Sequence, residues 1–190
     1  TRGSTQPDTK ATPKAAPKTT ALPKAGAKKS EPTKTFPTKP ITNLIVEKEI
    51  RSRIKKPTGE LTEADLEKVT KLDLDKNQLT VVKGLENLTQ LKELNLMKNK
   101  LTSAKGLEKL TQLKYLSLRD NQLTNVKGLE NLTQLEGLRL YDNKLTDVTG
   151  LEKLTQLTEL RLDGNQLTDV KGLEKLTQLK ELNLDHNKLT

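Results

Sequence analysis

The segment LKELNLMKNKLTSAKGLEKLTQ, residues 91–112, decides the fold, because close copies of it follow one another along most of the chain. One asparagine in this segment returns every 22 residues, as Asn77, Asn99, Asn121, Asn143, Asn165 and Asn187. A fixed period of about 20 residues indicates a solenoid, in which each unit packs only on its neighbours. Most residues then build the scaffold, and function must lie in the few positions that vary.

Each unit has a strand part and a return part. Leucines alternate with polar residues over 93–96, which predicts a short strand. Leu107 and Leu110 follow Gly106 at a spacing that suits a helical or 3-10 turn. We therefore expect an α/β solenoid, with a parallel sheet on the concave side and the turns on the other side.

Two constant positions have structural explanations. A buried asparagine can satisfy a backbone donor and a backbone acceptor where the strand turns away, so we expect the asparagines to form a ladder inside the coil. The repeated glycine suits a positive φ or a close approach of two backbones. This glycine occurs as Gly84, Gly106, Gly128, Gly150 and Gly172. Neither position indicates ligand binding.

Residues 41–68 differ from the repeats and are expected to form a helical N-terminal cap. A helix is predicted over 43–56, ended by Pro57, because its apolar residues share one face. These residues are Val46, Ile50 and Ile54. A second helix is predicted to begin at Thr62, with Asp65 completing a capping box. Such a unit covers the core that the first repeat would otherwise expose.

Residues 1–40 are expected to be a disordered linker. Seven of the eight prolines lie here, among Lys, Thr and Ala residues. Nine Lys/Arg residues against Asp8 and Glu31 give the segment a charge of +7, whereas the rest of the chain carries +2. Such a segment has too little apolar surface to fold. It suits a stiff spacer or, alternatively, an arm that binds polyanions.

Composition excludes several classes of protein. The chain has no cysteine, so disulfides, thiol catalysis and thiolate metal sites are excluded. Its longest apolar run, residues 44–46, is far too short to span a bilayer, and no signal peptide is visible. The single histidine, His186, has no catalytic companion in the repeat pattern. We therefore expect no enzyme activity, no cofactor and no metal.

The repeats resemble the bacterial leucine-rich repeats of the 22-residue, internalin-like class, and residues 56–66 are similar to the cap that precedes such repeats. The resemblance covers residues 43–190. It implies about five and a half repeats over 69–190. The chain stops within a repeat, without the family's C-terminal cap, so a longer natural protein is expected. The family's common role is binding macromolecules through the concave face, often at the cell surface.

Comparison of the units with one another locates the variable positions, which flank the strand leucines. The candidate partner-binding residues among them are Tyr115, Arg119, Arg139, Tyr141 and Arg161. Tyrosine and arginine are enriched at interface hot spots, and three arginines favour a partner with an acidic surface. The alternative is a solvated charge lattice, in which the arginines are paired internally with Asp142, Glu159 or Asp163.

We therefore predict a non-enzymatic, monomeric protein-binding module at the cell envelope or outside the cell, with the cytoplasm as the alternative location. One competing hypothesis is a structural or envelope-associated spacer whose basic tail binds polyanions. Another is the recognition part of a longer protein that continues beyond Thr190. The sequence does not name the partner.

Overall fold

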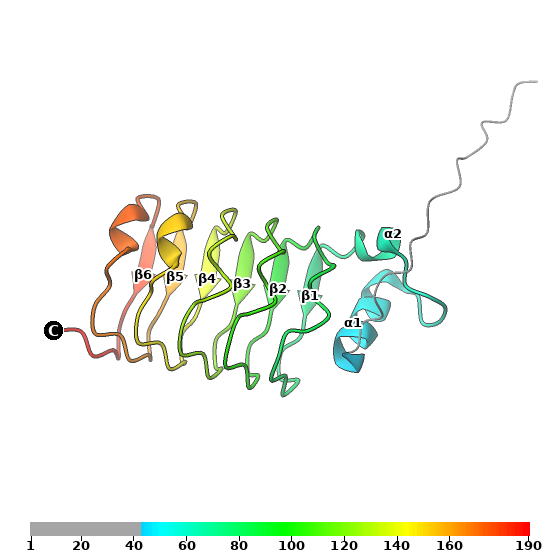
Figure 1. Ribbon diagram of the computed structural model, residues 1–190, viewed down its shortest axis with the longest axis horizontal. Helices are drawn as coiled ribbons and strands as arrows, with labels where there is room; N and C mark the ends of the chain where they lie inside the picture. Colours follow the sequence, from blue (N-terminus) through cyan, green and yellow to red (C-terminus); the bar gives the residue numbers. More distant parts are fainter. Residues whose placement is uncertain (1–42) are drawn as a thin grey trace, which may run out of the picture. The chain divides into compact units, whose positions relative to one another are not determined.

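Six short strands form one parallel sheet in chain order, β1-β2-β3-β4-β5-β6 (Figure 1). The computed structural model describes residues 43–190, and the linker expected at 1–40 lies outside them. The strands are β1 (Lys71–Asp73), β2 (Glu93–Asn95), β3 (Tyr115–Ser117), β4 (Gly137–Arg139), β5 (Glu159–Arg161) and β6 (Glu181–Asn183). Each residue pairs with the residue 22 positions further along, as Leu116 does with Leu138. This register confirms the solenoid.

The return side is a series of tight turns. Two repeats form regular 3-10 helices there, η1 (Leu151–Lys153) and η2 (Leu173–Lys175). Gly128 shows why glycine precedes these turns. Its φ is +101°, and a Cβ atom at this position would lie 2.7 Å from the carbonyl oxygen of Ala104 in the preceding repeat. Both reasons expected for the glycine, positive φ and close approach, therefore apply.

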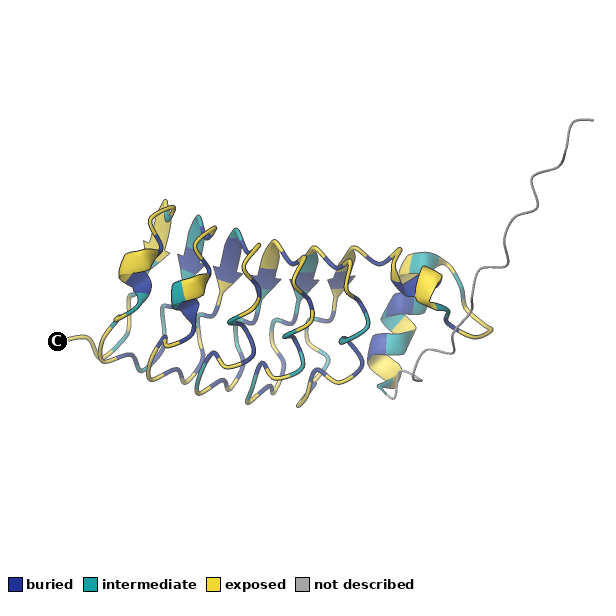
Figure 2. Ribbon diagram, turned by 45° about the horizontal axis from the view of Figure 1, so that its top comes forward, coloured by how far each residue is buried: buried dark blue, intermediate teal, exposed yellow. Residues whose placement is uncertain are grey.

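Buried positions recur in every coil of the array (Figure 2). Most of them are leucine, as the near absence of aromatic residues requires. The central strand leucines Leu138 and Leu160 are fully buried. Leu182 occupies the same position in β6 but is 44% exposed, because no further coil of residues 43–190 packs beyond it. Leu72 of β1, at the other edge of the sheet, is buried because the helical residues before β1 pack against that strand. Burial at this position thus needs packing on both sides.

The asparagines form the expected ladder, as Asn121 shows. Its Nδ2 donates to the carbonyl oxygens of Leu96 at 2.9 Å and Leu118 at 3.0 Å. Its Oδ1 accepts from the backbone N–H of Leu101 at 3.0 Å. Leu96 and Leu101 belong to the preceding repeat, so the side chain joins two coils. Burying these backbone groups without a partner would cost about 1–3 kcal/mol each.

The residue before each of these asparagines is left-handed, which sequence reasoning did not anticipate. These residues are Lys76, Lys98, Asp120, Asp142, Gly164 and His186, with φ between 53° and 65°. The backbone reverses there to leave the sheet. Gly164 is the signal that could have revealed this turn, since glycine adopts positive φ without strain. Asp120 and Asp142 agree with it, because aspartate tolerates this conformation better than most residues.

Two helices precede the sheet, α1 (Leu44–Ile54) and α2 (Glu63–Leu66). Asn43 caps α1, which ends two residues short of the prediction because Lys55 turns into the left-handed region at φ 55°. Val46 and Ile50 are fully buried in the core. The capping box of Thr62 and Asp65 is present as predicted. The helices therefore supply apolar side chains to the start of the array.

Candidate functional site

The five predicted binding residues come from three neighbouring repeats. Tyr115, Arg139 and Arg161 lie on β3, β4 and β5, while Arg119 and Tyr141 lie two residues beyond β3 and β4. The outward positions of the six repeats together form what we call the sheet face. These are Lys71, Glu93, Tyr115, Gly137, Glu159 and Glu181; Asp73, Asn95, Ser117, Arg139, Arg161 and Asn183; and Asp75, Met97, Arg119, Tyr141, Asp163 and Asp185.

A hollow of about 490 Å³ is lined by residues of β1 to β5 and by Arg53 of α1. Four of the five predicted residues line it, namely Tyr115, Arg119, Arg139 and Tyr141. The small polar residues Asp73, Asn95 and Ser117 also line it. Arg161 does not line the hollow but contacts Tyr141, which does.

Tyr141 is held between two arginines. The guanidinium carbon of Arg119 lies 4.6 Å from the centre of the Tyr141 ring, and that of Arg161 lies 4.9 Å from it. The two arginines belong to the repeats before and after that of Tyr141. Each contact is a cation–π interaction worth about 0.5–1 kcal/mol at an exposed site. The ring is therefore fixed in place before any partner arrives.

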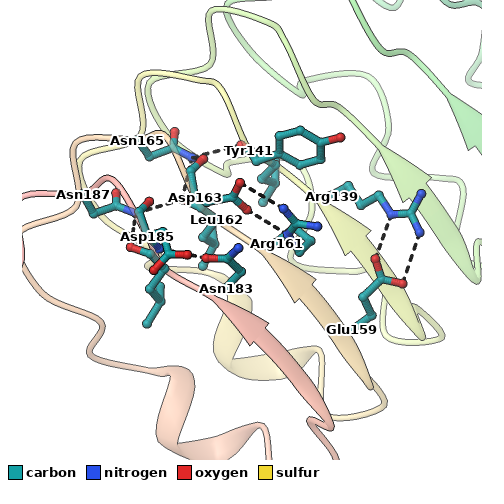
Figure 3. A network of polar contacts seen from close by, with 12 residues as sticks. Arg139, Tyr141, Glu159, Arg161, Leu162, Asp163, Asn165, Asn183, Asp185 and Asn187 are labelled. Carbon is teal, nitrogen blue, oxygen red and sulfur yellow. Dashed lines mark hydrogen bonds and ion pairs between the residues drawn. The ribbon is translucent and has the colours of Figure 1, made fainter.

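Every arginine of the predicted site has an internal carboxylate partner. Arg139 Nε donates to Glu159 at 2.8 Å, and Arg161 Nε donates to Asp163 at 2.8 Å; both arginines make a second bond through Nη2 (Figure 3). Two of the three carboxylates considered from the sequence thus serve as partners. Asp142 does not, and Asp120 accepts from Arg119 Nε at 2.7 Å instead.

These pairs shift the pKa values of their members. The hydrogen bond with Glu159 raises the pKa of Arg139, and the same bond lowers the pKa of Glu159. Both groups therefore remain charged over a wider range of pH. Because they are partly exposed, such pairs stabilise the fold by at most about 1 kcal/mol each. They do, however, offset the positive charges of the three arginines, which the sequence suggested would bind an acidic partner.

Tyr115 is held at its hydroxyl and along one edge of its ring. Its hydroxyl donates to Glu136 at 3.2 Å, and the ring lies against Gly137 of the next strand. Glu136 also accepts from Lys114, and the two bonds lower the pKa of its carboxyl group. The hydrogen bond to Glu136 raises the pKa of Tyr115, so the hydroxyl keeps its proton. The ring remains 48% exposed and available for contact.

Residues 43–190 contain no group of three or more His, Cys, Asp or Glu side chains that could hold a metal ion. Within the same range, no helix is both long and apolar enough to cross a membrane. The sheet face presents charged, tyrosine and small polar groups.

The comparisons with known proteins agree with this fold. The family described as Leucine Rich repeats (2 copies) matches residues 67–109, 111–153 and 155–190. These matches cover more than half of the chain, so the chain belongs to the leucine-rich-repeat family. The resemblance to leucine-rich repeats that was drawn from the sequence is thereby confirmed. Members of this family commonly serve as protein–protein interaction modules and are generally non-enzymatic.

Several solved structures are similar. A leucine-rich-repeat protein of Leptospira interrogans is 40% identical over 66% of this chain and 33% of its own, with a TM-score of 0.62. The ectodomain of the plant receptor kinase GASSHO1/SCHENGEN3 from Arabidopsis thaliana, solved in complex with CASPARIAN STRIP INTEGRITY FACTOR 2, is 31% identical over 65% of this chain and 16% of its own, with a TM-score of 0.57. An internalin of Listeria monocytogenes is 19% identical over 77% of this chain and 76% of its own, with a TM-score of 0.48.

This chain thus spans a third or less of the Leptospira and Arabidopsis proteins. No curated protein matches it significantly.

Proposed function

We propose that this chain is a non-enzymatic recognition module that binds a protein partner through its sheet face, centred on Tyr115, Arg119, Arg139, Tyr141 and Arg161. The proposal rests on the positions at which the repeats differ from one another. Otherwise similar repeats differ at all three outward positions, and both tyrosines of the chain lie there, beside the hollow. One return-side position differs as much but carries no aromatic or basic side chain, as Val81, Ser103, Asn125, Asp147 and Asp169. A scaffold alone gives no reason for tyrosine and arginine to gather at the outward positions.

Preorganisation supports the proposal. Tyr141 is held between Arg119 and Arg161, and Tyr115 is tethered to Glu136. A tyrosine brings a large contact area and a polar end while losing little rotamer freedom. Fixed in advance, such side chains lower the entropic cost of binding. The similar plant ectodomain, solved in complex with a partner, supports a binding role in the same sense.

A pull-down followed by affinity measurement tests the proposal. Once a partner is captured, Tyr141→Ala should weaken its binding by about 1–4 kcal/mol. Lys109→Ala and Lys153→Ala, on the return side, serve as controls and should change affinity little. If the return-side substitutions weaken binding more than those on the sheet face, the sheet face is not the binding surface.

The competing role is an envelope-associated spacer whose repeats supply only bulk. Its support is the internal pairing of all three arginines, which suits a solvated charge lattice. In that case the sheet-face substitutions leave every interaction of the chain unchanged, and only the basic segment 1–40 binds other molecules. Location at the cell envelope or outside the cell belongs to either proposal.

A further inference from the structure

The sheet face is acidic, although the repeats as a whole are slightly basic. Its 18 positions hold four basic side chains and seven acidic ones, a net charge of −3. Residues 43–190 hold 25 Lys/Arg and 23 Asp/Glu residues, a net charge of +2. All other surfaces of the described part therefore carry +5 together. The charge of the sheet face is thus opposite in sign to that of its surroundings.

The excess consists of carboxylates without a cation. All four basic side chains of the sheet face are paired: Lys71 with Glu93, Arg119 with Asp120, Arg139 with Glu159 and Arg161 with Asp163. Within residues 43–190, by contrast, no basic group lies within 4.0 Å of Asp73, Glu181 or Asp185. The unmatched charges of the face are therefore negative.

One unmatched carboxylate, Asp73, lines the hollow together with the ring of Tyr115. The other charged residues of the lining are Arg53, Lys71, Arg119, Arg139, Glu93 and Glu159. Each of them has an ion-pair partner, so within residues 43–190 Asp73 carries the one uncompensated charge of the lining. A lysine or arginine side chain can lay its stem along the tyrosine ring and direct its charge toward Asp73.

We infer that the partner of the sheet face is a basic protein segment, which places lysine or arginine side chains in the hollow over Tyr115 and against the unmatched carboxylates. This inference rests on the proposed function and specifies the partner's charge. The sign is opposite to that expected from the three arginines alone, because each of those arginines already has a carboxylate. An acidic segment would have to displace these carboxylates and approach a face of net charge −3.

The chain's own tyrosines report on this binding. It has two tyrosines and no tryptophan, and both tyrosines line the hollow. A titration of the full chain with octalysine, followed by tyrosine fluorescence, therefore observes the hollow directly. Eight extended residues span about 26 Å, close to the roughly 24 Å from β1 to β6. We expect saturable binding that weakens steeply between about 50 and 300 mM salt.

Substitutions at the two ends of the sheet face test the location. Asp73→Asn and Glu181→Gln should each weaken octalysine about twofold to fivefold, the range for one exposed ion pair. Asp147→Asn is the matched control, with the same change of charge away from the sheet face. Both Asp73 and Asp147 accept a bond from the backbone N–H two residues further along, and Asn keeps that acceptor. The control should leave the affinity unchanged.

A titration with the acidic peptide octaglutamate decides the sign of the partner's charge. Octaglutamate can bind the basic residues 1–40 by charge alone, so the tyrosine signal is the criterion. A saturable tyrosine response to octaglutamate and none to octalysine overturns the inference in favour of an acidic partner. Equal weakening by Asp147→Asn and Asp73→Asn, or no response to either peptide, also overturns it. Those results leave the sheet face itself to be judged by Tyr141→Ala with the captured partner.

Discussion

The ring of Tyr115 packs against Gly137, its register partner on the next strand. A Cβ atom at Gly137 would lie 2.8 Å from Cδ1 of that ring. The one tyrosine at this position of the repeats is thus followed by the one residue without a side chain. Gly137 makes room for the ring, and the hydroxyl of Tyr115 donates a hydrogen bond to the carboxylate of Glu136.

This relationship predicts that Gly137→Ala has different effects in two backgrounds. In the Tyr115→Ser chain, the substitution should stabilise the fold by about 0.4–1 kcal/mol, because alanine restricts the unfolded chain. With Tyr115 present, the displaced ring should cancel that gain. Chemical denaturation of the four proteins measures the difference as a double-mutant cycle. Equal effects in both backgrounds would mean that Tyr115 does not depend on Gly137.

One leucine position offers a matched test of burial. Leu138→Ala should cost about 2–5 kcal/mol, since the side chain is completely buried. The same change at Leu182, which is 44% exposed, should cost clearly less. Urea denaturation gives both values. Leu116→Ala should behave like Leu138→Ala, and a loss below about 0.5 kcal/mol would place these leucines outside the core.

The asparagine ladder predicts a second contrast. Asn121→Ala should cost about 1–3 kcal/mol, because it strands carbonyl groups and an N–H in two repeats. Asn77→Ala should cost less, since the Asn77 side chain bonds only the carbonyl oxygen of Asp75. The free energy of unfolding of each variant decides this. Similar losses at both positions would contradict the explanation by inter-repeat bonds.

The cap should weaken in acid through Asp65. Its carboxylate accepts from Lys56 at 2.6 Å and also from Thr62, and these bonds hold its pKa well below the ordinary 3.8. A depressed pKa stabilises the fold above the unfolded-state value, and the stabilisation is lost as pH falls below about 4. Asp65→Asn should therefore cost about 1–2 kcal/mol at pH 7.

The cost of Asp65→Asn should shrink progressively between about pH 4 and 2, as the carboxyl group of unfolded wild-type chains binds its proton. Urea denaturation across this range measures it. Asp147→Asn, an exposed change of the same kind, should show no comparable trend. A pH-independent cost would mean that Asp65 acts through packing rather than charge.

Removal of residues 1–40 should change the free energy of unfolding by less than about 0.5 kcal/mol. A segment with so little apolar surface is expected to make few native contacts. Any affinity of the chain for polyanions should fall with salt and disappear with the deletion. A clear drop in the thermal midpoint would show that this segment supports the repeats.

The repeat period is sufficient to predict most of the fold. The asparagine and glycine positions follow from backbone chemistry that recurs in every unit, so six copies reinforce one another. The ion pairs, by contrast, differ from one repeat to the next, because each arginine pairs with a carboxylate at a different repeat position. Arg161 has both Asp163 and Glu159 within reach on neighbouring positions, and only side-chain geometry selects Asp163. For the same reason, the sequence could not tell that Arg119 pairs with Asp120.

Other features have a signal in the sequence that is easily overlooked. The register of 22 residues already places Gly137 beside Tyr115. The constant glutamate after each Gly-Leu is explained by a bond that its carboxylate accepts from the glycine N–H, at 2.8 Å for Glu130 and Gly128. Both signals depend on how two neighbouring positions act together, which a position-by-position comparison does not reveal.

The direction of the asparagine bonds gives the array a polarity. From Asn99 onward, each side chain reaches back to the preceding coil, as Asn165 does to the N–H of Leu145 and the carbonyl oxygen of Leu140. The backbone groups inside a coil are therefore hydrogen-bonded by the asparagine of the coil that follows it. When one coil opens, its predecessor loses both an acceptor and a donor, so fraying that starts beside β6 tends to spread toward α1. Amide hydrogens should accordingly exchange with solvent in a gradient, fastest beside β6 and more slowly toward β1.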